Sequence, residues 1–482
     1  MAEALKENKM GTMRVSRLLF TVSIPIIISM LVQALYNIVD SVFVAKLDPI
    51  HGTGALTLAF PIQNLLLAVS VGMAVGINAL LSRSLGQKNF NKANQIAGQG
   101  FFLMACGYLL FLVFGIFLTK YYVDFQVKSM PLEEGMNLET LSKFTNQYVA
   151  MVSICSFGVF IQILAERLLQ ATGKTVLSMA IQLSGAIINI ILDPILIFGV
   201  PVLGIPKMEV FGAALATVIG QVVAAVVGIV LNLAFNKEIK IKIKNFIPEG
   251  KLIVEILTIS IPSILMQAIG TVMTLAMNKI LIKFSLNAVN VFGIYFKLQS
   301  FVFMPVFGLN SGMIPILSYN YGAGKPKRVF KTMKIAYIAA VAYILLGLVA
   351  FQFFPGTILS IFDSADGKLD IAMGITALQT ISWSFLFAGF SIISIASCQA
   401  LGKSIFSLFV SIGRQLVVLI PAAFLLSLFG EVKYVWWAFP IAEFASLLLC
   451  ALFLIITLKS AFGKKKDAKT IDTEEKKINE QA

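Results

Sequence analysis

Long apolar runs, each able to cross a lipid bilayer, repeat along almost the whole chain. A transmembrane helix needs about 20 consecutive, mainly apolar residues. Twelve runs meet this length, at residues 17–45, 54–81, 94–119, 144–171, 175–200, 211–236, 252–283, 287–318, 329–353, 371–401, 405–428 and 434–459. Only 13% of the 482 residues are charged, whereas soluble domains carry about 25%. The chain is therefore predicted to be an all-α polytopic membrane protein with 12 transmembrane helices.

Basic residues gather in every second connection between these runs. Lysines crowd residues 237–251 after the sixth run, and Lys464-Lys465-Lys466 begins the tail. The other connections carry acids such as Asp124 and Asp363. Because basic loops stay on the cytoplasmic side of a membrane, both termini are predicted to be cytoplasmic. The formal charge of +14 is explained by this orientation, so no nucleic-acid partner is expected.

Short motifs recur in both halves of the chain, in the same order. Ser23-Ile24-Pro25 recurs as Ser260-Ile261-Pro262, and Gln170-Ala171-Thr172-Gly173-Lys174 recurs as Gln399-Ala400-Leu401-Gly402-Lys403. A set of small residues recurs at a constant offset: Gly72, Gly76, Ser82 and Gly86 become Gly308, Gly312, Ser318 and Gly322. Each half has six runs, so both halves start on the same side. The two six-helix lobes should be related by a pseudo-two-fold axis along the membrane normal, a parallel repeat.

The repeats and the charge pattern give the boundaries of five segments. We expect a cytoplasmic N-terminal segment at 1–16, an N-lobe at 17–236 and a cytoplasmic inter-lobe linker at 237–251. A C-lobe should follow at 252–459, and a mixed-charge, disordered cytoplasmic tail at 460–482.

The first run carries a stripe of polar residues in otherwise lipid-like sequence. Spacings of i, i+3, i+4 and i+7 place four of them on one helical face: Gln33, Tyr36, Asn37 and Asp40. A carboxylate facing hydrocarbon costs roughly 2.5 kcal/mol or more, so Asp40 should face protein or a water-filled cavity. It is either a functional acid or a hydrogen-bonded acid that only holds helices together. Pro25 removes one backbone hydrogen bond about three turns earlier and marks either a bending point or a static kink.

The fifth run carries a second stripe, and the sixth adds a hydroxyl. The members are Gln182, Gly185, Asn189 and Asp193, followed by Thr217. The directions of the runs place Asp40, Asn189, Asp193 and Thr217 at a similar depth in the outer half of the N-lobe. Two neighbouring carboxylates in a low dielectric either share a proton or hold a cation between them. The residues thus predict a coupling site for H⁺ or Na⁺, and two separate structural acids are the alternative.

The second half lacks this charge. Met277 takes the place of Asp40, and the matching stripe is neutral: Gln267, Thr271, Thr274 and Asn278. We therefore expect ion coupling through the N-lobe alone. Three further charges lie within apolar runs: Arg414 and Glu443, which we expect to pair, and Lys297, for which an ion pair and a cavity-tuning role are both open. Glu166 beside Arg167 is interpreted as an interfacial pair or capping cluster.

Three motifs resemble the multidrug and toxic compound extrusion (MATE) family, over about residues 14–459. They are Leu35-Tyr36-Asn37-Ile38-Val39-Asp40-Ser41, Glu166-Arg167-Leu168-Leu169-Gln170-Ala171-Thr172-Gly173 and Asn189-Ile190-Ile191-Leu192-Asp193-Pro194. The resemblance implies two six-helix lobes that form a V. Similarity to the DinF-type branch implies a cation or proton site at Asp40, Asn189, Asp193 and Thr217.

The same resemblance implies where the substrate binds. Gln33 and Tyr36 match positions that line the drug cavity, and we expect the stripe residues Asn37 and Gln182 beside them. The NorM-type branch also uses acids in its second lobe, but the neighbourhoods of Gly270 and Phe390 have none here. This departure supports coupling through the first lobe only.

The function expected is export of lipophilic organic cations across a bacterial inner membrane, in exchange for inward H⁺ or Na⁺. No cofactor is needed, and a monomer is expected. A flippase for a lipid-linked or polysaccharide precursor is the nearest alternative, but it should line its cavity with several basic residues. A membrane-embedded enzyme would need a nucleophile–base pair or a metal cluster, and the chain has a single histidine, His51, in a loop.

Overall fold

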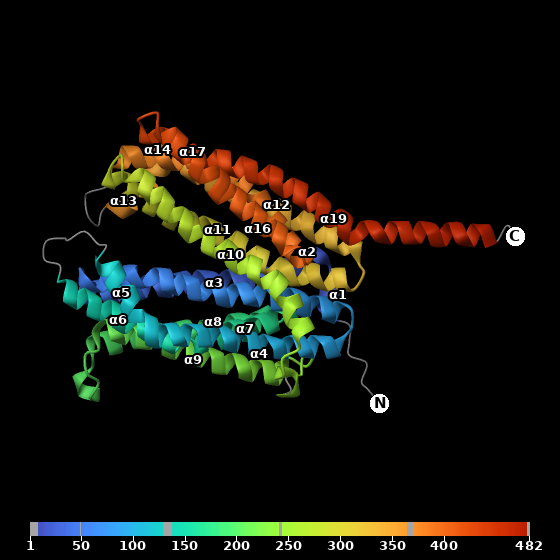
Figure 1. Ribbon diagram of the computed structural model, residues 1–482, viewed down its shortest axis with the longest axis horizontal. Coiled ribbons are helices and arrows are strands. Elements are labelled where there is room, and N and C mark those ends of the chain that lie inside the picture. Colours follow the sequence, from blue (N-terminus) through green and yellow to red (C-terminus); the bar gives the residue numbers. More distant parts are fainter. Residues whose placement is uncertain (1–7, 49, 129–136, 241–242, 364–369, 480–482) are drawn as a thin grey trace.

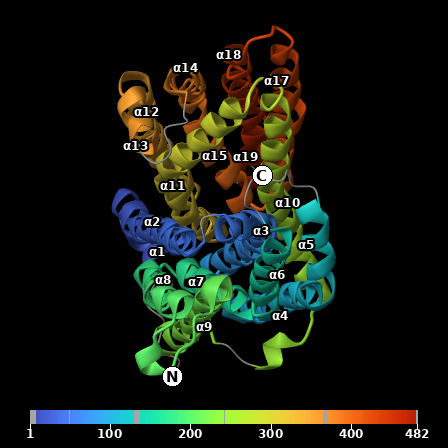
Figure 2. The same ribbon diagram turned by 90° about the vertical axis from the view of Figure 1, so that its left-hand side faces the viewer.

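The computed structural model describes residues 8–48, 50–128, 137–240, 243–363 and 370–479. Within these ranges the chain is helical, and the only β-type pairing is an isolated bridge between Val200 and Ile205. Figures 1 and 2 show two groups of helices, one from each half of the chain, packed against each other. The predicted two-lobed, all-α architecture is confirmed.

The first group is the N-lobe. Its helices are α1 (Lys9–Thr12), α2 (Val15–Leu47), α3 (His51–Gly86), α4 (Phe90–Val113), the π-helical η1 (Phe114–Leu118), α5 (Thr119–Lys128), α6 (Leu138–Ile154), α7 (Phe157–Ala171), α8 (Thr175–Phe198), the 3-10 turn η2 (Pro201–Leu203) and α9 (Glu209–Phe235). A 3-10 turn in the linker, η3 (Ile243–Phe246), then leads to the C-lobe.

The second group is the C-lobe. Its helices are α10 (Gly250–Leu281), α11 (Leu286–Gly322), α12 (Pro326–Phe353), α13 (Pro355–Asp363), α14 (Ile371–Ser382), α15 (Phe385–Ala400), α16 (Ser404–Ile412), the π-helical η4 (Gly413–Leu419), α17 (Ile420–Ser427), α18 (Val432–Val435) and α19 (Ala438–Asn479).

The described helices account for all twelve predicted spans. Ten are long and apolar enough to cross a membrane by themselves, and two bent pairs complete the set. One pair is α6 and α7, bent by 46°, and the other is α14 and α15, bent by 50°. The breaks fall at Ser156 and Ser384, which occupy a similar place in each lobe.

The end of the chain differs from the expectation of a disordered tail from residue 460. Helix α19 continues to Asn479 and extends beyond the lobes (Figure 1).

The two lobes meet through glycines that the repeats predict to be equivalent. Gly72 on α3 lies so close to α10 that an added Cβ would be 2.5 Å from Ile264 Cγ1. Its counterpart Gly308 on α11 lies against α2, where an added Cβ would be 2.5 Å from Ile27 Cγ1. Each lobe thus offers a glycine to the first helix of the other. This exchange of roles is what a parallel pseudo-two-fold axis produces.

The contact between lobes is tightest at the end predicted to be cytoplasmic. Gly86 there approaches the carbonyl of Tyr319, and the equivalent Gly322 approaches the carbonyl of Arg83. In Figure 1 the helices of the two lobes converge toward this end, near α1, and diverge toward the end with α5 and α14. The arrangement is therefore closed at the predicted cytoplasmic end.

Residues 8–13 form a strap across that closed end. On the N-lobe side, the Asn8 amide donates to the carbonyl of Thr172 (3.2 Å) and to the carboxylate of Glu238 (2.8 Å). On the C-lobe side, Asn320 donates to the carbonyl of Met10 (3.0 Å) and Arg328 to that of Met13 (2.7 Å). The strap must lose one set of these bonds if the lobes separate here.

Pro25 lies inside α2 at the contact with the other lobe. Its missing N–H leaves the carbonyl of Thr21 without its helical partner, and the Thr175 hydroxyl of α8 donates to that carbonyl at 3.5 Å. Helix α2 is assigned as one helix through this point, from Val15 to Leu47. Bending at Pro25 stays a prediction.

Candidate functional site: a polar cluster in the N-lobe

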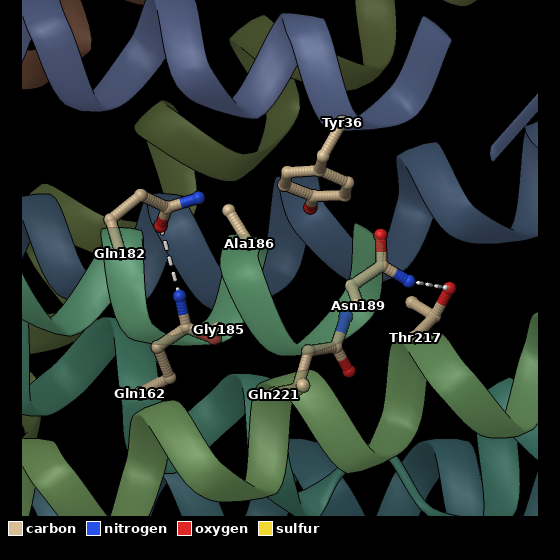
Figure 3. Close-up of a pocket in the computed structure, with 9 residues that line it drawn as sticks. Tyr36, Gln162, Gln182, Gly185, Ala186, Asn189, Thr217 and Gln221 are labelled. Carbon is tan, nitrogen blue, oxygen red and sulfur yellow. Dashed lines mark hydrogen bonds between the residues drawn. The ribbon is translucent and has the colours of Figure 1, made fainter. Parts of the chain in front are cut away.

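Two glycines bring α8 and α9 close together beneath α2. An added Cβ at Gly220 would lie 2.7 Å from the carbonyl oxygen of Gly185, and one at Gly185 would lie 3.0 Å from that of Gly220. Small residues allow this approach between membrane helices. As a result, Asn189 of α8 lies next to the turn of α9 that carries Thr217, as Figure 3 shows.

Asn189 connects two of the predicted site residues. Its Nδ2 donates to Asp193 Oδ1, one turn later on α8, at 3.2 Å. The same atom lies 3.4 Å from Thr217 Oγ1 on α9. Asp193 and Asn189 are buried, with exposed fractions of 0% and 3%.

Asp40 reaches the same region from α2. It is 8% exposed, and α2 packs against α8, which carries Asp193. Three buried acceptor atoms of the cluster have no hydrogen-bond partner among the described residues: Asp40 Oδ1, Asn189 Oδ1 and Asp193 Oδ2. Buried acceptors without donors are costly unless something positive satisfies them. The available oxygen ligands are two carboxylates, an amide oxygen and a hydroxyl oxygen. They suit a hard cation such as Na⁺, or a proton bound to one of the acids.

A small cavity of about 20 Å³ lies beside these residues. It is lined by Tyr36, Gln162, Gln182, Gly185, Ala186, Asn189, Thr217, Gly220 and Gln221. In Figure 3 the ring of Tyr36 descends from α2 on the side opposite α9. Sites for drug-sized ligands usually measure about 300–1,000 Å³. The cavity therefore fits the surroundings of an ion and its water better than a complete drug site.

The residues predicted for the substrate cavity separate into two groups. Tyr36 and Gln182 line the cavity, whereas Gln33 and Asn37 are not among its lining residues. Gln33 is partly buried next to Tyr36 in the helical stripe, and Asn37 is exposed.

Two polar partners of the cluster were not predicted as site residues. Tyr148 on α6 is 1% exposed, accepts a hydrogen bond from Gln63 Nε2 (2.9 Å) and lies within the field of both Asp40 and Asp193. Gln162 on α7 donates to Gln182 Oε1 at 2.9 Å and lies 3.0 Å from Glu166 Oε1. The i, i+4 spacing of Gln162 and Glu166 is a polar stripe that could have revealed this side of the site.

Glu166 and Arg167 differ from the expected interfacial pair. Arg167 Nη1 donates to Gln170 Oε1 (2.8 Å), and the described residues contain no salt bridge between the two neighbours. Glu166 turns inward instead, toward Gln162 and within the electrostatic reach of Tyr36. Successive residues on a helix point about 100° apart, which separates the two side chains.

The intramembrane charges of the C-lobe are arranged differently. Arg414 Nη1 donates to Glu443 Oε1 at 2.6 Å, which confirms the expected pair. Lys297 is exposed on α11, and no salt bridge to it occurs within the described ranges. Met277, at the place of Asp40, is fully buried in the apolar core.

Met277→Ala provides a test of coupling through one lobe. We expect the variant to lose stability, because truncating a buried methionine costs about 2–5 kcal/mol. Ion coupling should remain, since Met277 offers no charge to an ion. The check is the ratio of ions to dye transported by reconstituted protein, compared with wild type. A changed ratio would contradict the one-lobe assignment.

Two lobes of six spans, closed at one end and carrying buried acids in one lobe, define a polytopic membrane transporter. The sequence profile of the MatE family matches residues 25–195 and 262–425, and the chain belongs to this family. The multidrug export protein MepA of Staphylococcus haemolyticus is 29% identical over 439 residues, covering 91% of this chain and 92% of that protein. MepA of Staphylococcus aureus is 28% identical over 457 residues, covering 94% of each.

Solved structures show the same fold. A multidrug resistance MATE family transporter of the MOP superfamily, in an outward-facing conformation, matches with a TM-score of 0.84 at 21% identity, covering 95% of this chain and 98% of that one. A MOP superfamily transporter from Pyrococcus furiosus, with a binding pocket of reverse polarity, matches with a TM-score of 0.82 at 22% identity, covering the same shares.

Proposed function

We propose that this protein is a secondary active antiporter of the DinF-type branch, which exports lipophilic organic cations in exchange for inward H⁺ or Na⁺. It works as a monomer in a bacterial inner membrane, with both termini in the cytoplasm and without a cofactor. The observation that carries the proposal is the set of three buried acceptor atoms, on Asp40, Asn189 and Asp193, that lack a donor. Such a set gains most from a small cation.

The closed end explains how the exchange is organised. With the lobes in contact at the predicted cytoplasmic end, the acids in the outer half of the N-lobe take up H⁺ or Na⁺ from outside. Loading removes the unbalanced charge of Asp40 and Asp193, and a cationic substrate then loses its electrostatic attraction to the site. Export requires only that the two ions differ in their affinity for the two conformations.

The substrate class follows from the relatives and from the surface beside the site. The similar staphylococcal proteins carry the name multidrug export protein. Tyr36 supplies an aromatic face to the cavity next to the acids, and aromatic faces attract organic cations. The 39 Phe and 18 Met residues of the chain offer further adaptable apolar surface.

A flippase for a lipid-linked precursor is the second candidate. The observation in its favour is Lys297, an exposed lysine within a membrane span that could hold a phosphate. One lysine is a weak diphosphate site, and the buried acids have no role in this alternative.

The proposal is tested by dye efflux from proteoliposomes with each ion gradient imposed separately. We expect a proton or a sodium gradient to accelerate efflux of a cationic dye severalfold over protein-free liposomes. Indifference to both gradients would refute antiport. Movement of a fluorescent lipid-linked precursor, independent of either gradient, would favour the flippase.

A further inference from the structure

The C-lobe contains a nearly buried ion pair that the transport mechanism does not use. Arg414 lies in η4, and Glu443 lies near the start of α19, with Nη1 and Oε1 2.6 Å apart. Their side chains are 26% and 13% exposed. Ser446 and Cys450, which follow Glu443 on the same face of α19, are buried, so Glu443 points into the lobe.

The local backbone places Arg414 beside α19. A π-helical turn, in which each residue bonds to the fifth one before it, interrupts the span at Gly413–Leu419. Gly413 permits the close approach, because an added Cβ would lie 2.7 Å from Leu449 Cδ1. Such turns are rare and often mark functional positions.

The pair leaves polar atoms unsatisfied. Glu443 Oε2 and Arg414 Nε are buried and have no hydrogen-bond partner among the described residues. A pair selected only for stability would be expected to satisfy these atoms, since buried ion pairs stabilise little unless their remaining bonds are made.

The pair occupies the region that corresponds to the N-lobe cluster. The spacing that separates Gln170 from Gln399 aligns Asn189 and Asp193 with Val418 and Ala422, and Thr217 with Ser446. The C-lobe thus has apolar residues where α8 of the N-lobe has Asn189 and Asp193. Arg414 lies about one turn before Val418, and Glu443 about one turn before Ser446.

We propose that the C-lobe contains a monovalent-cation site at Glu443, and that the guanidinium of Arg414 permanently occupies it. The inference rests on the proposed function in treating the N-lobe cluster as the ion site. An arginine side chain stays protonated and is covalently attached to the chain. The coupling ion therefore cannot bind to Glu443. Arg414 is accordingly the residue that limits ion exchange to the N-lobe. Without it, a carboxylate this deep in the protein takes up Na⁺ or a proton.

The test uses the full chain with the N-lobe site removed by Asp40→Asn and Asp193→Asn. In this background, Arg414→Gln should bind one more cation per molecule. Binding of ²²Na⁺ to the purified protein detects a gained Na⁺, and the infrared carbonyl stretch of a protonated carboxyl detects a gained proton. The gain should vanish in Arg414→Gln/Glu443→Gln, and Arg414→Lys should show none.

Two results would overturn the inference: no gain in folded Arg414→Gln, or a gain that persists without Glu443. If Arg414→Gln is not monodisperse, Arg414→Ala with ethylguanidinium as the probe decides. Millimolar ethylguanidinium should raise the unfolding temperature of Arg414→Ala but not of Arg414→Ala/Glu443→Ala, and equal behaviour of the two would refute the site. Failure of the proposed function can be told apart from failure of this inference. If the proposed function is wrong, the Asp40→Asn variant of the otherwise wild-type chain will still exchange ions.

Discussion

Replacing Asp40 with asparagine is expected to reduce gradient-driven efflux of a cationic dye to the rate of passive leak. Asparagine keeps the shape of the side chain but removes its negative charge. The cluster then has Asp193 as its remaining acid, and the attraction for either the coupling ion or the cationic substrate falls. The measurement is efflux from proteoliposomes under an imposed proton or sodium gradient. Asp193→Asn should behave in the same way.

The matched control for this prediction is Asp48→Asn. Asp48 follows the same helix, is partly exposed and accepts hydrogen bonds from the backbone and ring of His51 instead of contacting the cluster. Burial is the largest single influence and opposes ionisation, but the hydrogen bonds from His51 and Ile50 and the charge of His51 together outweigh it and hold the pKa of Asp48 below its usual value. The control should retain transport at neutral pH. Wild-type efflux from Asp40→Asn would remove this acid from the mechanism.

Gly312→Ala is the second substitution with a large expected effect. Gly312 on α11 lies against α2, and an added Cβ would be 2.9 Å from Ser23 Cα. Backbone cannot yield as a flexible side chain does, so the lobes must separate at this level. Overpacking of this kind costs about 1–3 kcal/mol, a factor of roughly 5–150 in the ratio of two conformations. We expect a shift away from the closed state and at least a loss of about fivefold in export.

The shift is measured as a distance between spin labels at Gln87 and Lys327, both exposed at the closed end. The four native cysteines are first replaced. Gly293→Ala is the matched control, because this glycine lies on the same helix with no atom within 4 Å of an added Cβ. By the pseudo-symmetry, Gly76→Ala should reproduce the effect against Ser260. An unchanged distance distribution in both glycine variants would show that these contacts do not hold the lobes together.

Much of the architecture could be predicted because the bilayer imposes simple rules. The length of each apolar run, the side on which lysines lie and the recurrence of Gly72 as Gly308 each follow from the sequence. The extension of α19 past residue 460 could not be predicted from composition, because a mixed-charge segment is compatible with either disorder or a solvated helix.

The candidate site shows that spacing along the sequence does not predict which residues of a polar stripe are buried. At 100° per residue, Asn37 and Tyr36 lie about 100° apart on either side of Asp40. A stripe this wide cannot be buried entirely, and Asn37 is at its exposed edge. Tyr148 could not be predicted for another reason: its position relative to Asp40 depends on how α6 packs in the folded lobe, which no spacing along the chain records.

The glycine contacts between the lobes contain no titratable group of their own, whereas charged groups such as Lys92, Glu255 and Glu238 lie in separate contacts at the same end. Helix α2 bears the sealing residues Ser23 and Ile27 near its beginning and Asp40 near its end, about 20 Å further along the axis. Helix α2 therefore connects the proposed ion site directly to the contacts between the lobes, so under the proposed function binding of a proton or a sodium ion at Asp40 would reach these contacts without passing through other helices.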